Sequence, residues 1–411
     1  MASPGPSSPP ASRSTRRRAP SAASNAGVLP PDVLFDVLLR LPAKELCRLR
    51  AVCHGWRSLT MDPLFASAHA ARHPDPLFLA SFRDDRMHIC VADLSGNVVK
   101  RIPNADGHQL LCTRLDLACA ASVGNSCHVI DPATGSVHVL PESPAVAHLY
   151  EENLHETSTS FVFGRVATTG EYKVLRSFAP IYTEADVEHY HYQLFEVFTI
   201  NGASSSGSGH AHWRALMPRY EGWRYNECFV EVRSAIVIGE VVYFKVDIAY
   251  DEQIGLDRIV PFDLEREEWM EVLRGPISDI FFTDEYDNHL EDYRSLGSEL
   301  TLAELRGSLG LVHYRKYHHI MDLWVLKDFD SFLWVKEHII QIEPIFPTTE
   351  GFVKSLFMLE DGRIVIHFPV TGLLFIYDPR TNTSAQVEMR HLDAVAMYTG
   401  NLLSLQVGDM M

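Results

Sequence analysis

The sequence predicts a mainly β protein that carries a small α-helical module near its N-terminus. Three observations support this fold class. Residues 29–65 are strongly apolar, interrupted by prolines and spaced as in helices. From about residue 75, short β-branched and aromatic runs alternate with turn residues, and one strand-and-turn pattern recurs six times. With 411 residues, of which 46% are hydrophobic, the chain can form a sizeable core.

Residues 1–27 form the first expected segment, which is rich in proline, serine and alanine. The segment has too few apolar groups to offset the entropy of an ordered chain, so we expect a disordered tail. Arg16, Arg17 and Arg18 are compatible with a nuclear-import signal, and the serine- and arginine-rich composition with an organellar transit peptide. A solubilising tail is the simpler alternative.

Residues 28–74 are expected to hold three short helices. The first begins at Pro30-Pro31-Asp32, because the first helical turn tolerates proline and its positive end favours aspartate, and it runs to about Leu41 before Pro42. The second starts near Ala43, and Gly55 separates it from a third helix that Asp62-Pro63 terminates. The apolar positions of the three helices are Val33, Leu34, Val37, Leu38, Leu41, Leu46, Leu49, Val52, Trp56 and Leu59.

This helical stretch resembles an F-box. The matching residues are Leu29, Pro30, Asp32, Leu34, Val37, Leu38, Arg40, Leu41, Pro42, Leu46, Arg48, Arg50, Val52, Cys53, Trp56, Arg57, Leu59, Asp62, Pro63 and Phe65. The departures from the family's pattern are Val37, Glu45 and His54, and none of them removes an apolar anchor. The resemblance implies docking on a Skp-type adaptor and, through it, on cullin and RING subunits of a ubiquitin ligase.

The residues themselves also indicate a partner, because a module of roughly 40 residues cannot bury all these apolar side chains alone. Leu29, Pro30, Leu34 and Leu38 are expected to face the partner, and Trp56 to be structural. In the alternative, Val33, Val37, Leu46, Val52 and Trp56 are only the module's own core. The full set assigned to adaptor docking is Leu29, Pro30, Leu34, Val37, Leu38, Leu41, Pro42, Leu46, Val52 and Trp56.

Residues 75–411 are expected to form the β domain. The repeated pattern is an apolar strand, an aspartate or another polar residue, a turn and a second strand that often carries tryptophan. Its copies begin at Ile89, Val129, Phe195, Ile259, Trp324 and Phe375. Six such hairpins predict a β-propeller of about six blades, in which each blade is covered by its neighbours. A pair of β-sandwiches is the alternative.

The β region also resembles the plant F-box-associated domain, which is kelch-like. The matching segments include 161–164 with 171–174, the pair Trp213-Arg214, and residues 262–269, 305–309 and 321–326. The resemblance describes a scaffold that presents loops and does not name a ligand.

Composition and motifs exclude several other functions. The formal net charge is −17, and residues 1–31 contain four arginines and no acidic residue, so the remainder carries −21, which argues against nucleic-acid binding. No apolar stretch is long enough to span a membrane, which predicts a chain without membrane contact. Seven cysteines without regular spacing indicate reduced thiols and a cytoplasmic or nuclear location.

We expect neither catalysis nor a cofactor. The sequence contains no G-x-S-x-G, H-E-x-x-H, phosphate-loop or G-x-G-x-x-G motif. The histidine groupings His189/His191, His210/His212 and His318/His319 offer at most two metal ligands each, whereas zinc requires three or four, so no metal is expected.

Recognition of a target protein should therefore rest on loops at one face of the β domain. Three long polar insertions qualify, at residues 146–158, 179–192 and 283–294. The last of these supplies the candidate substrate-binding residues Asp284, Glu285, Tyr286, Asp287, Glu291 and Tyr293, which suit a basic peptide. A solvated loop without a ligand is the alternative.

Taken together, the sequence and its resemblances predict a substrate-recognition subunit of an SCF-type ubiquitin ligase that contributes position and no catalytic side chain. Two other functions remain open: an F-box scaffold that acts outside a ligase, and a propeller enzyme with a polar cluster in its channel.

Overall fold

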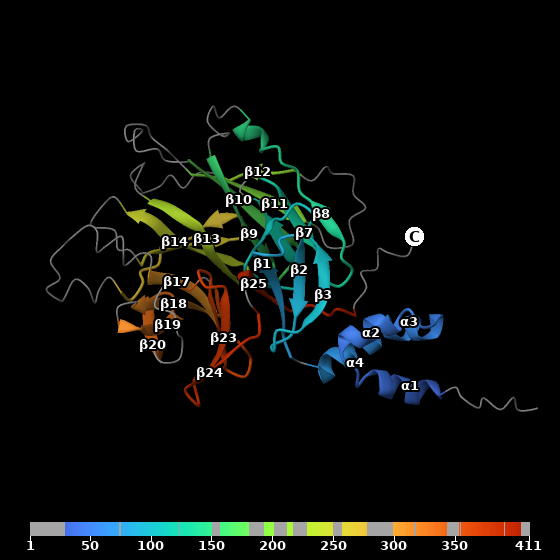
Figure 1. Ribbon diagram of the computed structural model, residues 1–411. Helices are drawn as coiled ribbons and strands as arrows, with labels where there is room; N and C mark the ends of the chain where they lie inside the picture. The colour runs from blue at the N-terminus through green and yellow to red at the C-terminus, as the bar shows by residue number, and fades with distance from the viewer. Residues whose placement is uncertain are drawn as a thin grey trace, which may run out of the picture.

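The fold is seen in a computed structural model of the chain. It describes residues 29–73, 75–122, 124–149, 157–180, 193–200, 212–216, 228–249, 257–277, 299–315, 318–342, 353, 355–389 and 391–403. Within these ranges the chain forms four N-terminal helices followed by a β-propeller, so the predicted fold class is confirmed (Figure 1). None of the described helices combines the length and the apolar character needed to cross a membrane.

The helical module contains four helices instead of the predicted three. They are α1 (Pro31–Leu38), α2 (Ala43–Leu49), α3 (His54–Thr60) and α4 (Pro63–Arg72). The Asp62-Pro63 pair ends α3 but also begins α4, because the Asp62 carboxylate accepts a hydrogen bond from the Leu64 amide at 2.8 Å and Pro63 occupies the first turn. This start signal was visible in the sequence and was interpreted only as a stop.

Two other helix boundaries also differ from expectation. Helix α1 ends at Leu38, and single turns continue the chain to Leu41 before Pro42. Gly55 lies inside the first turn of α3 and does not interrupt it; the cap is Cys53, whose sulfur accepts from the Trp56 amide. A glycine in the first turn lowers the stability of a helix only slightly, because the amides of that turn have no hydrogen-bond partner within the helix.

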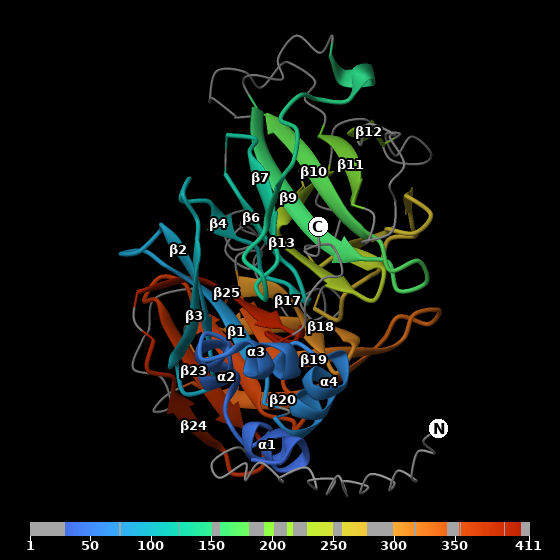
Figure 2. The ribbon, with the colours of Figure 1, turned by 90° about the vertical axis from the view of Figure 1, so that its right-hand side faces the viewer.

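The β region is a ring of six four-stranded blades within the described residues (Figures 1 and 2). Blade 1 comprises β25 (Leu392–Tyr398), β1 (Leu77–Phe82), β2 (His88–Ala92) and β3 (Val98–Pro103). Blade 2 comprises β4 (Gln109–Leu110), β6 (Ala118–Ala121), β7 (Cys127–Ile130) and β8 (Val137–Val139). Blade 3 comprises β9 (Thr157–Arg165), β10 (Tyr172–Pro180), β11 (Leu194–Ile200) and β12 (Arg214–Ala215).

The other three blades follow in chain order. Blade 4 comprises β13 (Cys228–Ile238), β14 (Val241–Ala249), β15 (Ile259–Asp263) and β16 (Glu268–Trp269). Blade 5 comprises β17 (Leu300–Leu305), β18 (Ser308–Arg315), β19 (Ile320–Asp328) and β20 (Leu333–Gln341), and blade 6 comprises β21 (Ser355–Met358), β22 (Ile364–Phe368), β23 (Leu373–Asp378) and β24 (Thr383–Gln386). A single parallel bridge, Glu304 to Phe357, joins blades 5 and 6 into one eight-stranded sheet.

The C-terminal strand closes the ring. Strand β25 pairs antiparallel with β1, the first strand of the chain, from Leu77 opposite Tyr398 to Phe82 opposite Leu392. On its other side β25 pairs in parallel with the short strand β5 (Arg114–Leu115). Pairing the two ends of the β region within blade 1 closes the ring.

Each copy of the repeated sequence pattern is the third strand of a blade. The six copies correspond to β2, β7, β11, β15, β19 and β23. In five copies the aspartate after the strand folds the turn to the fourth strand by accepting backbone hydrogen bonds two residues on, as Asp93 does from Ser95 and Asp378 from Arg380, both at 2.9 Å. The number of copies therefore equals the number of blades. The copies are irregularly spaced because the links between blades differ in length.

Tryptophans on or beside the fourth strands pack against the preceding blade. The Trp213 indole donates to the Pro141 carbonyl of the blade 2–3 link at 2.6 Å, and Trp334 donates to the Arg274 carbonyl after blade 4 at 2.7 Å. Trp269 packs its ring 5.0 Å from that of Phe195 in blade 3. These tryptophans contact the preceding blade because the fourth strands that carry them lie beside the link from that blade.

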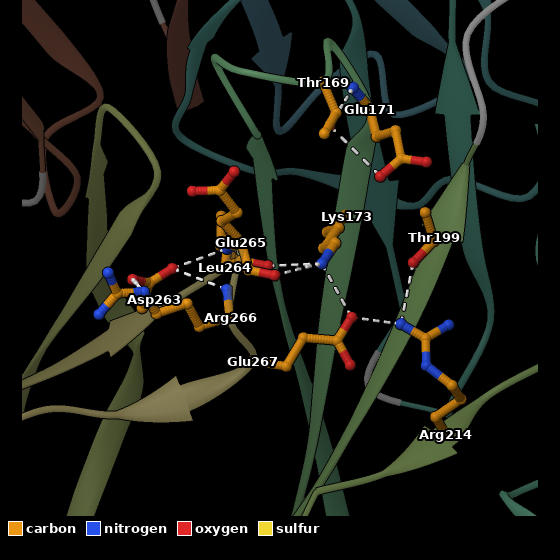
Figure 3. A network of polar contacts seen from close by, with 10 residues as sticks. All are labelled: Thr169, Glu171, Lys173, Thr199, Arg214, Asp263, Leu264, Glu265, Arg266 and Glu267. Atoms are coloured by element: carbon orange, nitrogen blue, oxygen red, sulfur yellow. Dashed lines mark hydrogen bonds and ion pairs between the residues drawn. The ribbon is translucent and has the colours of Figure 1, made fainter.

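A polar network fastens blade 3 to blade 4 (Figure 3). The buried Lys173 ammonium donates to the Leu264 carbonyl at 2.6 Å and to the Glu267 carboxylate at 2.8 Å. Arg214 pairs with the same carboxylate and donates to the Thr199 hydroxyl at 3.0 Å. Blade 3 thus holds the turn between β15 and β16, which is part of the segment that resembles the F-box-associated domain.

Candidate docking surface and recognition face

The helical module has its own compact core. Leu38, Leu46, Phe65 and Ala66 are buried, and Leu34, Leu41, Trp56 and Leu59 pack around them partly exposed. The Phe35 ring meets Phe65 edge to face with centroids 5.1 Å apart. Phe65 and Ala66 come from α4, so the helix that was not predicted is needed to close this core.

Several large apolar side chains of the module remain exposed. The exposed fractions are 44% for Val33 and Val37 in α1 and 61% for Val52 after α2. Leu29 before α1 and Leu64 at the start of α4 are also exposed. Val33 and Val37 are four residues apart and therefore lie on one side of α1. We call Leu29, Val33, Val37, Val52 and Leu64 the exposed apolar set.

The structure divides the predicted docking residues into three groups. Leu29, Pro30, Val37, Pro42 and Val52 are exposed, while Leu34, Leu41 and Trp56 are partly exposed. Leu38 and Leu46 are 1% and 0% exposed, so in this structure they support the module from inside and do not face outward. Leu34 and Leu38 are four residues apart on one face of α1, about 100° away from Val33 and Val37, and this face lies against the core of the module.

His69 joins α4 to the turn that follows α1. Its ring Nε2 lies 2.9 Å from the Leu41 carbonyl oxygen, and His73 stacks on it with centroids 4.3 Å apart. Burial lowers the pKa of His69 from 6.5; the Leu41 carbonyl opposes this shift, and His73 adds to it. The folded module therefore favours a neutral His69.

This predicts that acid destabilises the module. Below pH 6.5 the unfolded state takes up a proton at His69 before the folded state does, so the free energy of unfolding falls as the pH decreases. Thermal unfolding followed by far-UV circular dichroism between pH 7.5 and 5.5 should show a smaller pH dependence for His69→Gln than for the wild type. His54→Gln, at an exposed position in α3, is the control; equal slopes in all three proteins would contradict the prediction.

The module is anchored to blade 1 and to the segment after β25. The Lys44 ammonium donates to the Val98 carbonyl of β3 at 2.7 Å. The Arg50 guanidinium donates to the Leu403 carbonyl at 2.9 Å, and the Asn401 amide donates to the Ala66 carbonyl at 2.7 Å. The Leu403 side chain is fully buried in the core of the helical module. The strand that closes the propeller and the segment after it therefore also complete the helical core.

A buried ion pair stabilises blades 2 and 3. Arg176 in β10 and Glu196 in β11 are both 0% exposed and are paired through Arg176 Nη2 and Glu196 Oε2. The Glu196 carboxylate also accepts from the Ala145 amide at 2.8 Å and lies 2.7 Å from His148 Nδ1, both in the blade 2–3 link. Burial raises the pKa of Glu196, but hydrogen bonds from His148 and Arg176 outweigh burial, and the net pKa is lowered.

The other Arg176 contacts cross to blade 2. The guanidinium donates to the Asn125 side chain at 2.8 Å and to the Glu142 and Ser143 carbonyls at 3.1 Å each. It also lies 3.9 Å above the Trp213 ring. This single cation therefore connects two blades and the link between them.

An open pocket of about 330 Å³ lies where the first strands of blades 5 and 6 turn back. Its lining includes Arg114 and Glu304, whose guanidinium and carboxylate are 3.0 Å apart, together with Arg306, Met358 and Glu360. The ion pair satisfies both charges, and the described lining contains no nucleophile beside a base.

The candidate recognition loops fall largely outside the described residues. This applies to residues 150–156, 181–192 and all of 283–294, including Asp284, Glu285, Tyr286, Asp287, Glu291 and Tyr293. The N-terminal tail 1–27 also lies outside them, as do His189, His191 and His210. The part of the first insertion that is described contains a short 3₁₀ turn, η1 (Val146–His148).

The flanking strands nevertheless define the face from which the three insertions emerge. In an antiparallel blade, the link between the second and third strands and the link to the next blade leave at the same end. The insertions connect β8 to β9, β10 to β11 and β16 to β17, so all three emerge at one face, which we call the recognition face. Leu77 at the start of β1 pairs with Tyr398 at the end of β25, which places the helical module at the opposite face (Figure 1).

Comparison with known families agrees with both parts of the structure. Residues 85–403 match the F-box associated beta propeller domain, and residues 26–69 match an F-box-like domain. The chain belongs to the F-box-associated propeller family. Both predicted resemblances are thereby confirmed.

The relatives of this F-box protein are plant proteins. An F-box/kelch-repeat protein of Arabidopsis thaliana is 25% identical over 362 residues, covering 82% of this chain and 84% of the relative. Two F-box proteins of the same plant are 23% identical over 406 residues (92% and 90% covered) and 26% identical over 397 residues (86% and 85% covered). Among solved structures, a chain of a nidogen/laminin complex aligns with a TM-score of 0.41 at 10% identity over 79% of this chain and 99% of that chain.

F-box proteins are typically non-catalytic adaptors, and an F-box generally implies a Skp-type partner. For this F-box protein, sequence reasoning missed Val33 and Leu64 as exposed apolar side chains. The helical spacing could have revealed Val33, because a face containing Leu34, Leu38 and Leu41 leaves Val33 and Val37 beside it. Leu64 could not be placed while α4 was unrecognised.

Proposed function

We propose that this F-box protein is the substrate-recognition subunit of an SCF-type cullin–RING ubiquitin ligase. The observation that carries the proposal is the exposed apolar set on a module whose core is already complete. A core that is filled by Leu38, Leu46, Phe65 and Leu403 leaves Val33, Val37 and Val52 available for a partner. Apolar side chains on short helices suit the groove of a Skp-type adaptor.

The mechanism is proximity. The adaptor, and through it cullin and RING subunits, would hold the helical module, while the recognition face at the other side of the propeller would hold a target protein. Buried contacts between module and propeller reduce the freedom of the target relative to the ligase, which raises the effective concentration of its lysines near the conjugating enzyme. The protein itself contributes no catalytic group, and we expect it to act in the cytoplasm or nucleus.

Reconstitution tests the ligase role. The full chain is combined with a Skp-type adaptor, cullin and RING subunits and analysed by size-exclusion chromatography. Co-elution of all four proteins is expected. Elution with the adaptor alone would contradict the ligase role and favour a scaffold that acts outside a ligase.

Purification from plant cells under proteasome inhibition would then identify the target. The wild type and a Val33→Asp/Val37→Asp variant should capture the same companions through the propeller, but only the wild type should capture them in ubiquitinated form. Equal ubiquitination in both samples would contradict the proposal.

A further inference from the structure

We infer that Asp106, His108 and His128 form a binding site for a divalent transition metal ion of the zinc class. Asp106 and His108 lie in the link from β3 of blade 1 to β4 of blade 2, and His128 lies in β7 of blade 2. His128 lies twenty positions after His108 in sequence, and none of the three residues belongs to the histidine groupings weighed above. Only the fold brings them together.

The donor atoms lie close to one another. One donor atom from each of the three residues falls within 4.8 Å of the others, and His128 Nε2 is 3.7 Å from Asp106 Oδ2. The two imidazole rings meet edge to face with centroids 4.2 Å apart. Donors that are each about 2.0–2.2 Å from a shared tetrahedral ion lie about 3.3–3.6 Å apart. The 3.7 Å separation of His128 and Asp106 is already close to this, and a separation of 4.8 Å would have to shorten by at most about 1.5 Å. The Asp106 side chain is 63% exposed and can make this movement by rotation.

The link that carries two of the ligands is held by buried hydrogen bonds. The buried Asn104 side chain donates to the Arg86 carbonyl at 3.0 Å and to the His108 carbonyl at 2.8 Å. The Gly107 amide donates to the Asn104 carbonyl at 2.9 Å, and the φ of Gly107, +64°, is one that glycine adopts without strain. The backbone of His108 is therefore fixed before any ion binds.

One nitrogen of the His108 ring is buried without a hydrogen-bond partner in the described part of the chain. The residue is 5% exposed, and the nitrogen is Nδ1. A buried polar atom in this state requires an explanation, and a bound ion or water is a common one.

The donor set determines the class of ion. Two imidazole nitrogens and one carboxylate oxygen suit Zn²⁺ and neighbouring transition metals, whereas Mg²⁺ and Ca²⁺ prefer oxygen ligands throughout. Three protein ligands leave a fourth position open to water or to a group from another molecule. The link from blade 1 to blade 2 emerges at the recognition face, so this open position lies on the side of the candidate target loops.

Zinc titration of the full chain tests the inference. Purified protein is stripped with a chelator and titrated with Zn²⁺ against a chromophoric competitor. Asp106→Asn and His128→Gln should each remove the same single equivalent of bound zinc or weaken it at least tenfold. His138→Gln is the matched control, because His138 is an exposed histidine on the neighbouring strand β8, and it should bind zinc as the wild type does.

Thermal unfolding gives a second readout. Zinc should raise the melting temperature of the wild type and of His138→Gln, because an ion that binds the folded state stabilises it, but should raise that of Asp106→Asn less. Asp106 is exposed, so its variant keeps the test valid even if His128→Gln fails to fold. Unchanged zinc stoichiometry and affinity in Asp106→Asn, or no zinc binding by the wild type, would overturn the inference and leave Asp106 and His128 as an ordinary ion pair.

Discussion

Replacing Glu196 by alanine is expected to lower the free energy of unfolding by about 3–5 kcal/mol, because it leaves the Arg176 cation buried without a carboxylate. Both side chains are fully buried, and Glu196 also holds the Ala145 amide and the His148 ring of the blade 2–3 link. Urea denaturation followed by far-UV circular dichroism measures the loss, and Trp213, one of six tryptophans, lies 3.9 Å from the Arg176 guanidinium and contributes to the fluorescence change.

Two variants make this experiment specific. Glu268→Ala removes an exposed carboxylate from β16 and should have little effect. Arg176→Met/Glu196→Ala removes both charges and should recover part of the lost stability, since a buried pair is often replaceable by apolar side chains. A loss below about 1 kcal/mol for Glu196→Ala would show that the pair does not stabilise the junction between blades 2 and 3.

Truncating Leu403 to alanine is expected to destabilise the helical module by about 2–5 kcal/mol, the usual cost of a cavity left by a buried leucine. Leu403 is fully buried among Leu38, Leu46 and Phe65, although more than 300 positions separate it from them in sequence. Hydrogen exchange followed by mass spectrometry should show faster exchange in α2 and α4 and unchanged exchange in blade 3.

The adjacent leucine is the matched control. Leu402 is also buried, but it packs in a propeller cluster with Leu79, Ile89 and Tyr398. Leu402→Ala should therefore loosen blade 1 more than the helices. If the two variants gave the same exchange pattern, or if Leu403→Ala left α2 and α4 protected, the module would not depend on the chain end in the way described.

Local signals in the sequence were sufficient to predict the architecture. The six strand-and-turn copies are the six third strands, because an aspartate that accepts backbone hydrogen bonds in a turn is a short-range feature. The proline and aspartate at the start of α1 likewise act within one turn. Helix α4 was missed because the same pair, Asp62-Pro63, serves as a stop for one helix and a start for the next.

The contacts that assemble the molecule could not be read in this way. Leu403 packs in a core formed by residues 34–66. Arg176 and Glu196 form an ion pair at the junction between blades 2 and 3. His108, in the link between blades 1 and 2, contacts His128 in strand β7. Each depends on how distant segments pack, which spacing along the chain does not encode. For α1, the apolar positions were correctly identified, but the division between Leu38 inside and Val37 outside depended on where α2 and α4 lie.

The central claim is that the exposed apolar set docks on a Skp-type adaptor, and isothermal titration of the adaptor into the purified full chain tests it most directly. The account predicts a binding heat for the wild type and a Kd about 100-fold weaker for Val33→Asp/Val37→Asp. It predicts wild-type binding for Val335→Asp/Ile339→Asp, which places two carboxylates on exposed positions of strand β20. No heat of binding for the wild type, or equal affinity for all three proteins, would contradict the account.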